Sequence, residues 1–133
     1  MSTFHLQIVT LDGLSFDGEA EKLIVRTIDG DVCILPRHIN LVTALGMGEA
    51  KVFADGAVRR AACIGGLLSV ANNEVKLVPT TFEWAEDIDP ERARRAREAA
   101  ENALKDKTKS KVDLAIAEAK LKRALVRQSV SGL

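Results

Sequence analysis

An abrupt change of composition near Phe82 limits what this chain can fold into more than any other feature. Before that point, apolar residues come in short groups separated by glycine, aspartate and asparagine. After it, glycine is absent up to Ser131, and alanine, glutamate, arginine and lysine predominate. The first pattern is typical of short β-strands and the second of helices. The sequence therefore predicts an α+β protein in two parts, with a β domain at residues 1–84 and a helical domain at residues 85–133.

The first part carries four turn signals between its apolar groups. They are Asp12-Gly13, Asp29-Gly30, Asp55-Gly56 and Asn72-Asn73, pairs that accept the positive φ angles of tight hairpin turns. Many short strands separated by such turns are typical of a sandwich or a barrel. We expect an antiparallel β-sandwich of about ten short strands. The candidate strands cover residues 4–9, 15–20, 23–27, 32–35, 41–45, 50–53, 57–64, 67–70 and 74–78.

The second part has clear signals for two helices. Asp89 can cap the free N–H groups of a helix that starts at Pro90, and this helix should reach about Leu104. Ser110, with an acidic residue three positions later, can cap a second helix that runs to about Gln128. A short polar connector joins them, so we expect an antiparallel helical hairpin. The expected apolar stripes are Ala93, Ala96, Ala100 and Ala103 on the first helix and Leu114, Ala117, Leu121 and Leu125 on the second.

The alanine stripe predicts a weakly held hairpin. Full burial of a leucine-sized side chain contributes ~1.5–3 kcal/mol, whereas an alanine methyl contributes much less. Leu104 is the only large aliphatic side chain of the first helix. Such a hairpin can open, although permanent docking, with alanine chosen for close packing, explains the same pattern.

The charges of the chain balance, with 19 Lys+Arg against 19 Asp+Glu. The first part has 7 basic and 10 acidic residues, and the second has 12 and 9. A neutral chain is a poor candidate for a surface built to bind nucleic acid or anionic lipid. No apolar run reaches the ~18–20 residues that span a bilayer, and the first residues lack the features of a secretory signal. We therefore expect a protein that stays in the cytoplasm.

No motif in the sequence indicates catalysis or a metal site. Cys33 and Cys63 lack the paired spacing of zinc ligands, and we expect both to be reduced, buried thiols. Gly65-Gly66 is not followed by the Gly-Lys-Ser/Thr of a phosphate-binding loop. The scattered Asp, Glu and His residues select no reaction, so an independent enzyme is not expected.

Several motifs occur together in one order along the chain. Residues 6–10 (LQIVT) come first, followed by residues 30–38 (GDVCILPRH) and then residues 41–45 (LVTAL). Residues 65–70 (GGLLSV) and residues 88–93 (IDPERA) complete the series. In this order and over nearly the whole chain, they resemble the epsilon subunit of F-type ATP synthases.

The resemblance implies a non-catalytic subunit of the central stalk that needs no cofactor. Its sandwich would bind the gamma subunit and rest on the c-ring, peripherally at the cytoplasmic face of the bacterial plasma membrane. The residues that it implies for these contacts are Asp29, Asp31, Arg37 and His38. All four lie at expected strand ends, where ordinary turn chemistry also accounts for them.

In the family that this chain resembles, the helical hairpin switches between a folded and an extended form. The extended form would place basic residues against acidic segments of the catalytic alpha and beta subunits and block ATP hydrolysis. The basic residues available here are Arg92, Arg94, Arg95, Arg97, Lys120, Lys122, Arg123 and Arg127. Such a run of charge is also what a solvated helix face looks like.

Some members of that family bind ATP in the folded hairpin as a regulatory ligand. The matching residues here are Glu83, Ile88, Asp89, Arg92, Ala93, Arg123 and Arg127. Guanidinium groups suit phosphate oxygens, and Arg123 and Arg127 lie on one helix face. Ala99 stands where the ATP-binding members carry an arginine, so any affinity should be weak. Asp89 has a second explanation as a helix cap, and Arg92 has one as a surface residue.

Two other functions fit the same residues. One is a nucleic-acid-binding module with a small β-barrel and basic helices, although the acidic first part and the scarcity of aromatic residues disfavour it. The other is a free-standing ATP sensor. Co-purification with a gamma subunit, binding to single-stranded nucleic acid, and ATP titration distinguish the three.

Overall fold

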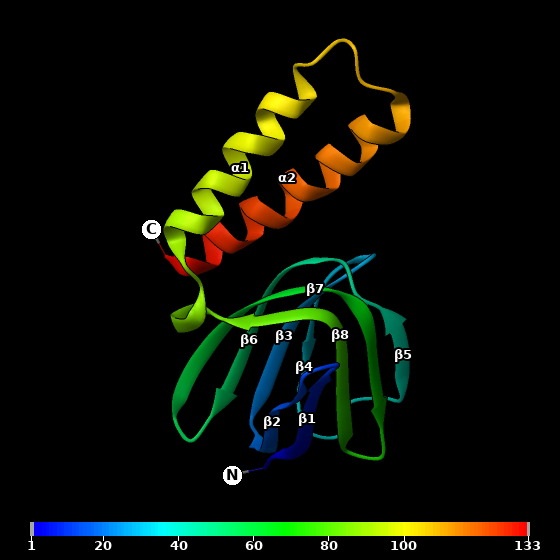
Figure 1. Ribbon diagram of the computed structural model, residues 1–133. Helices are drawn as coiled ribbons and strands as arrows, with labels where there is room; N and C mark the ends of the chain where they lie inside the picture. Colours follow the sequence, from blue (N-terminus) through cyan, green and yellow to red (C-terminus); the bar gives the residue numbers. More distant parts are fainter. Residues whose placement is uncertain (1, 133) are drawn as a thin grey trace. The chain divides into compact units, whose positions relative to one another are not determined.

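The computed structural model describes residues 2–132, which form eight strands, a short 3-10 helix (η1) and two α-helices (Figure 1). The two-part α+β fold expected from the sequence, a β-sandwich followed by a helical hairpin, is confirmed. The chain divides after Trp84 into two compact units. The strands are β1 Phe4–Thr10, β2 Gly13–Ala20, β3 Lys22–Thr27, β4 Gly30–Ile34, β5 Leu41–Ala44, β6 Met47–Ala54, β7 Ala57–Ala71 and β8 Glu74–Trp84. The helices are η1 Ala85–Asp87, α1 Pro90–Leu104 and α2 Lys111–Ser131.

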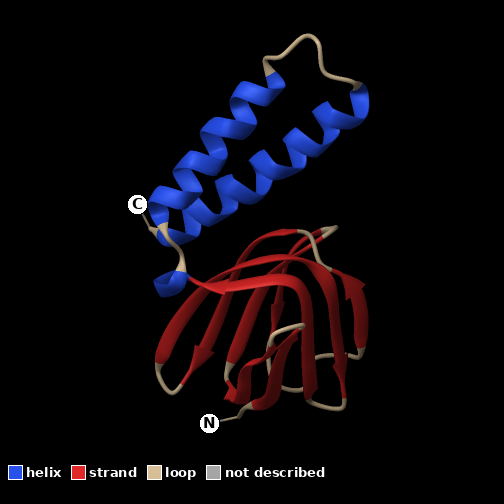
Figure 2. Cartoon of the chain, in the orientation of Figure 1, coloured by secondary structure: helices blue, strands red, loops and turns tan. Residues whose placement is uncertain are grey.

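One continuous hydrogen-bonded sheet, drawn in red in Figure 2, builds the sandwich. Its strand order is β2-β1-β8-β7-β6-β3-β4, and β5 pairs with β7 beside this path. The core takes alternate residues of each strand, as the two-residue period of a strand requires. Its fully buried members with the largest side chains include Phe4, Leu6, Ile8, Leu23, Ile34, Leu68 and Leu77.

The long strand β7 serves both layers of the sandwich. Its first half pairs with β6, with Met47 opposite Ile64, and its second half pairs with β5, with Ala44 opposite Leu67. The two pairings continue in the same register along β7. The bend between the halves falls at Gly65 and Gly66, with φ angles of 68° and 102°. Glycine adopts such angles without strain.

The glycine pair explains one difference from the sequence prediction. We expected two strands on either side of Gly65-Gly66, but the pair bends a single strand without ending it. The sandwich therefore has eight strands instead of about ten. A second difference is that β1 and β8 pair in parallel. No hairpin turn joins these two strands, so nothing local fixes their relative direction.

The expected burial of both cysteines is wrong for Cys33. Its side chain is exposed, because β4 alternates and places Val32 and Ile34 on the other side. Cys63 is buried, and this burial raises the pKa of its thiol to about 12. At neutral pH the Cys63 thiol is therefore protonated and unreactive.

The two helices begin and end as the capping signals indicate. Asp89 caps α1, and the hydroxyl of Ser110 accepts a hydrogen bond of 3.1 Å from the backbone N–H of Asp113 at the start of α2. Gly132 ends α2 in the left-handed conformation with a φ of 79°. Helix α2 is three residues longer than expected.

The buried positions of the helices match the expected stripes in part, since Ala93, Ala100 and Ala117 were expected and the other two were not. The buried positions are Ala93 and Ala100 on α1 and Ala117, Ala124 and Val130 on α2. Ala96 and Leu125 are exposed, the latter by 41%. The alanine pairs on the two helices are each seven residues apart, which is two helical turns, so the helices meet along a narrow seam of methyl groups.

His5 joins three strands of the sandwich through its ring. Its Nε2 lies 2.6 Å from a carboxylate oxygen of Asp17 on β2, and its Nδ1 lies 3.0 Å from one of Glu74 on β8. Both nitrogens can donate only when the ring is protonated. The hydrogen bond to Asp17, followed by that to Glu74, raises the pKa of His5 above its ordinary value of 6.5.

None of the helices within residues 2–132 is both long and apolar enough to cross a membrane.

Replacing Gly66 with alanine should destabilise the sandwich strongly. An added Cβ would overlap the carbonyl oxygen of Val78 and lie 2.6 Å from the Cα atom of Pro79. We expect a loss of about 3 kcal/mol or more in the free energy of unfolding. Gly56→Ala is the matched control, because Gly56 also has a positive φ but nothing within 4 Å of the added atom. It should lose only about 1–2 kcal/mol in urea unfolding. Equal losses in the two variants would contradict this account of the bend.

The His5 contacts predict a pH-dependent contribution to stability. Because the pKa of His5 is raised in the folded state, the contribution is fully present below about pH 6.5 and lost as the pH rises through the folded pKa. The difference in unfolding free energy between the wild type and His5→Gln should therefore shrink as the pH rises above about 6.5. His38→Gln is the control, since the ring of His38 bonds the carbonyl oxygen of Ile39. A His5→Gln difference that stays constant with pH would argue against the double contact.

Candidate functional site

The four residues expected to contact partner subunits lie at two ends of one strand. Asp29 is in the turn before β4, and Asp31, near the start of β4, binds the Nε of Arg26 with its carboxylate at 2.7 Å. Arg37 and His38 lie in the loop after β4. The structure therefore does not bring all four together in one site.

Hydrogen bonds from the neighbouring turn hold the loop of Arg37 and His38. The backbone N–H of Arg37, which has a φ of 63°, donates to the side-chain oxygen of Asn73 at 2.8 Å. The side-chain amide of Asn73 donates in turn to the carbonyl oxygen of Thr3 at 2.9 Å. On the same turn, the backbone N–H of Asn72 donates to the Asn40 side chain at 3.2 Å. The sequence marked residues 72 and 73 only as a turn, so their role in shaping this loop was missed.

Both ends of β4 carry exposed apolar side chains beside these polar residues. Ile28 precedes Asp29 and is 67% exposed, and Ile39 follows His38 and is 78% exposed. Single exposed aliphatic side chains are common on protein surfaces, so these two isoleucines do not by themselves identify a contact surface.

An outer apolar row, formed by Leu14, Val42, Leu67 and Val78, is a feature that the sequence did not indicate. These side chains come from β2, β5, β7 and β8 and are between 43% and 72% exposed. Leu67 lies opposite Val78 in the pairing of β7 with β8, so these two apolar side chains are neighbours across the strands. Apolar residues occur on both faces of β7, so alternation could not tell the outer face from the core.

The residues that the sequence assigned to ATP come from both units of the chain. Glu83 lies on β8, in the other unit of the chain. Ile88 and Ala93 are buried, with 6% and 3% of their surface exposed. One carboxylate oxygen of Asp89 accepts hydrogen bonds from the backbone N–H groups of residues 91 and 92, at 3.0 and 3.2 Å. The Asp89 carboxylate thus caps the helix.

Arg123 and Arg127 line a cavity of about 540 Å³ between α1 and α2. This interhelical hollow is the same order of size as ordinary small-molecule sites. Its lining residues are Ala96, Ala99, Ala100, Ala103, Lys109, Asp113, Ile116, Ala117, Lys120, Arg123, Ala124 and Arg127. Of the seven residues assigned to ATP, only these two arginines line it. Lys109 and Lys120 were not assigned to this site from the sequence. For Lys120 the signal was present, because the spacing of residues 116, 120, 123 and 127 places these four residues on one helix face.

The basic residues of the hairpin fall into two groups by their partners. Arg94 pairs with Glu91 and Glu98, and it lowers the pKa of Glu91 through a hydrogen bond. Arg97 reaches Glu101 at 3.4 Å, and its guanidinium donates to Gln128 at 3.0 Å. Helix α1 thus neutralises part of its own charge.

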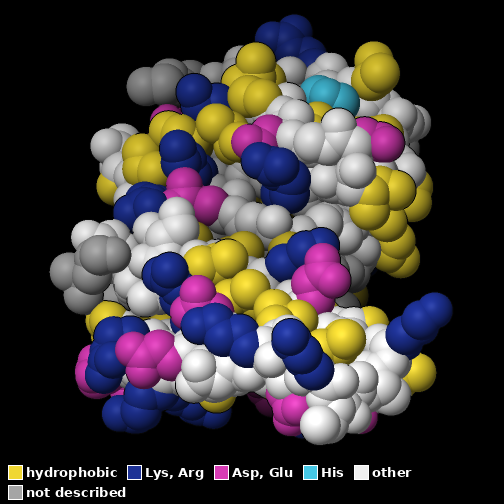
Figure 3. Space-filling model, turned by 90° about the horizontal axis from the view of Figure 1, so that it is seen from above, with side chains coloured by type: hydrophobic (Ala, Val, Ile, Leu, Met, Phe, Trp, Pro, Cys, Tyr) yellow, Lys and Arg dark blue, Asp and Glu magenta, His cyan; other side chains and the backbone are white. Residues whose placement is uncertain are grey.

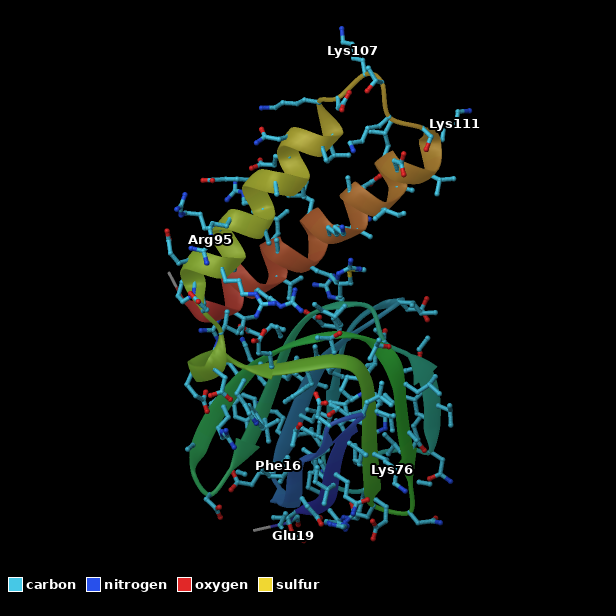
Figure 4. All side chains as sticks on the ribbon, viewed as in Figure 1. Phe16, Glu19, Lys76, Arg95, Lys107 and Lys111 are labelled. Carbon is cyan, nitrogen blue, oxygen red and sulfur yellow. The ribbon has the colours of Figure 1, made fainter. Side chains whose placement is uncertain are left out.

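Two basic residues of α2 lack such partners in the described part of the chain. Lys122 approaches Glu118 at 3.9 Å, whereas Lys120 and Arg123 have no acidic partner within residues 2–132. Figure 4 shows Arg95 on the side of α1 away from α2, with Lys107 reaching out from the connector. In Figure 3, basic, acidic and apolar side chains are mixed over the face shown.

No group of three or more His, Cys, Asp or Glu side chains in the described part of the chain is arranged to hold a metal ion.

Comparison with known proteins gives matches over nearly the whole chain. The family model for the beta-sandwich domain of the ATP synthase Delta/Epsilon chain matches residues 3–85. The model for the long alpha-helix domain of the same chain matches residues 86–132.

Curated relatives are of similar length. The ATP synthase epsilon chain of Halalkalibacterium halodurans is 37% identical over 132 residues, covering 99% of each chain. That of Ruminococcus albus is 38% identical over 132 residues, covering 98% of each.

Two solved structures share the fold at low sequence identity. A chain of the Euglena gracilis mitochondrial ATP synthase structure (OSCP/F1/c-ring) superposes with a TM-score of 0.86 at 19% identity, covering 97% of this chain and 81% of that chain. A chain of the Tetrahymena thermophila mitochondrial ATP synthase structure (central stalk and c-ring) gives a TM-score of 0.64 at 10% identity, covering 96% and 95%.

Proposed function

We propose that this chain, which belongs to the epsilon subunit family of F-type ATP synthases, is a non-catalytic subunit of the central stalk. In this function the sandwich couples the gamma subunit to the c-ring during ATP synthesis. The helical hairpin restrains ATP hydrolysis. The complex would hold the chain peripherally at the cytoplasmic face of the membrane.

Two features of the sandwich support the coupling role. Its core of large aliphatic side chains, with Leu6, Ile8, Leu23 and Leu77 at 0% exposure, resists deformation under load. Its surface carries the outer apolar row and the exposed isoleucines at both ends of β4. A protein that transmits torque needs a rigid body with more than one contact surface, and the sandwich offers both.

The observation that carries the regulatory role is the alanine seam between α1 and α2. Each buried alanine methyl contributes far less than the ~1.5–3 kcal/mol of a buried leucine. Good intrinsic helix formers keep each helix intact while the contact between the helices stays weak. The hairpin can therefore open without unfolding its helices.

An opened hairpin exposes cations that could bind a partner. Lys120 and Arg123 lack acidic partners in residues 2–132, and Arg92 is exposed on α1. Acidic segments of the catalytic alpha and beta subunits are the complementary surface, and such charges fix register and partner choice more than affinity. In this function the extended hairpin blocks rotation in the hydrolysis direction.

A nucleotide would act as a regulatory ligand of the closed hairpin. Arg123 and Arg127 line the interhelical hollow, where guanidinium groups can meet phosphate oxygens. A ligand that binds only the closed form shifts the population toward that form. ATP would then relieve the inhibition of hydrolysis.

Removing the hairpin tests the regulatory role directly. The assembled complex with the chain truncated after Asp87 should hydrolyse ATP at least about twice as fast as the complex with the full chain, the ratio expected if half of the hairpins are extended. The truncated chain should still co-purify with gamma, which serves as the control for assembly. Unchanged hydrolysis with intact assembly would rule out inhibition by the hairpin. Salt-sensitive binding to single-stranded nucleic acid without any gamma partner would instead favour the nucleic-acid module.

Ala124→Leu tests whether the alanine seam sets the balance between closed and open hairpins. Ala124 is 1% exposed, so a larger side chain forces the helices apart at about 1–3 kcal/mol. The population should shift toward the open form, and hydrolysis by the assembled complex should fall. Ala115→Leu, at an exposed position on the same helix, should leave the rate unchanged. Equal rates for the two variants would show that the seam does not control inhibition.

A further inference from the structure

The ring of His5 on β1 lies between two carboxylates from different strands. Its Nε2 is 2.6 Å from an oxygen of Asp17 on β2, and its Nδ1 is 3.0 Å from an oxygen of Glu74 on β8. An ionised carboxylate can only accept a hydrogen bond, so both contacts are hydrogen bonds only while both ring nitrogens carry hydrogen. A neutral ring has a single N–H and can bond only one of the two carboxylates.

The other charged groups on this face of the sheet replace neither contact. Glu19 on β2 lies opposite His5, but its carboxylate accepts a hydrogen bond of 2.8 Å from the hydroxyl of Thr3. Lys76 on β8 lies one step further along the sheet, opposite Gln7 (Figure 4). Three carboxylates and one ammonium group therefore share this face with the ring, and this balance favours its protonated form.

The side chain of Asn73 connects this cluster to a second segment of the sandwich. Glu74 directly follows Asn73, whose carbonyl oxygen accepts a hydrogen bond of 3.2 Å from the backbone N–H of His5. The Asn73 side chain accepts a bond of 2.8 Å from the backbone N–H of Arg37 and donates one of 2.9 Å to the carbonyl oxygen of Thr3. One asparagine thus bonds both the strand of the histidine and the loop that follows β4.

The loop at residues 35–40 depends on these bonds for its conformation. Arg37 has a φ of 63°, which a residue other than glycine keeps only where its surroundings hold it. The side chain of Asn40 accepts a further bond of 3.2 Å from a backbone N–H of the same turn. Loss of the bond to Asn73 would leave the Arg37 N–H to water and free the loop to change its conformation.

We infer that His5 is a pH-sensitive switch for the loop of residues 35–40. In its cationic form the ring binds Glu74 and thereby fixes the turn that holds the loop. When the ring becomes neutral, the shorter contact, to Asp17, keeps the remaining hydrogen. The lone pair of Nδ1 then faces an oxygen of Glu74, whose side chain is 70% exposed and moves into water. The turn loses this attachment, and the loop loosens.

The direction of the switch follows from the same contacts. The hydrogen bond to Asp17, followed by that to Glu74, raises the pKa of His5 above 6.5. The loop is therefore held at low pH and released as the pH rises through this raised value. The loop includes two residues expected to contact partner subunits, so under the proposed function that contact would be firmer at low pH. The switch itself lies within one chain and does not require that function.

Amide hydrogen exchange, followed by NMR on the full-length chain, tests the switch at the backbone N–H of Arg37. Its protection factor, which corrects for the intrinsic pH dependence of exchange, should fall at least about threefold between about pH 5.5 and about pH 8.5. The midpoint should coincide with the titration of the His5 ring signals. The backbone N–H of Gly56, in a turn that bonds neither residue, is the control within the same spectra.

Three variants separate the parts of the switch. Glu74→Gln should keep the loop held at every pH, because an amide can accept from the cationic ring and donate to the neutral one. Asn73→Gly should loosen it at every pH, since glycine keeps the φ of 64° but lacks the side chain that bonds the loop. His38→Gln removes the histidine within the loop and should leave the pH dependence intact.

Three results would overturn the inference. They are a constant protection factor of Arg37 while His5 titrates, a pH dependence that survives in Glu74→Gln, and one that disappears in His38→Gln. The last would place the sensor in the loop itself. None of these results bears on the stalk role, which the gamma and truncation experiments test independently.

Discussion

The bend of β7 at Gly65 and Gly66 is the constraint on which the sandwich depends. Because this one strand continues from one layer into the other, β5 and β6 lie along its edge in a single register, and β8 follows it on the other side. Only residues without a Cβ can bring β7 this close to the backbone of Val78 and Pro79. A local backbone requirement thus fixes how the two layers of the sandwich connect.

The sandwich and the helical hairpin are each stabilised by a different kind of internal packing. The sandwich buries many leucine- and isoleucine-sized side chains, so its interior is close-packed and resists rearrangement. The helical hairpin buries mainly alanines, so little apolar surface is lost when its helices separate. Capping by Asp89 and Ser110 stabilises each helix on its own. The chain therefore joins a rigid body to an element whose helices can persist while their mutual contact changes.

The sequence predicted what depends on local chemistry. The change of composition near Phe82, the turn pairs and the helix caps correspond to the observed elements. It could not show that Gly65-Gly66 bends a strand, that β1 lies parallel to β8, or that Cys33 faces out, because each depends on residues distant in sequence. The residues of the candidate site likewise include some that the sequence predicted and one that only the structure reveals. Spacing placed Arg123 and Arg127 on one helix face, but only the packing of α1 against α2 shows that Lys120 shares their hollow.

Under the proposed function, one set of cations would serve two states of the hairpin. Lys120, Arg123 and Arg127 line the hollow when the helices are closed. When the helices separate, the same side chains become available to acidic segments of partner subunits. A cation that holds a phosphate cannot at the same time pair with a carboxylate, so anion binding and inhibition exclude each other. Linkage then requires that whatever strengthens the partner contact weakens the affinity for the anion by the same factor. The arginines of α1 that pair with their own glutamates take no part in this exchange, because their charge is already neutralised in the closed state.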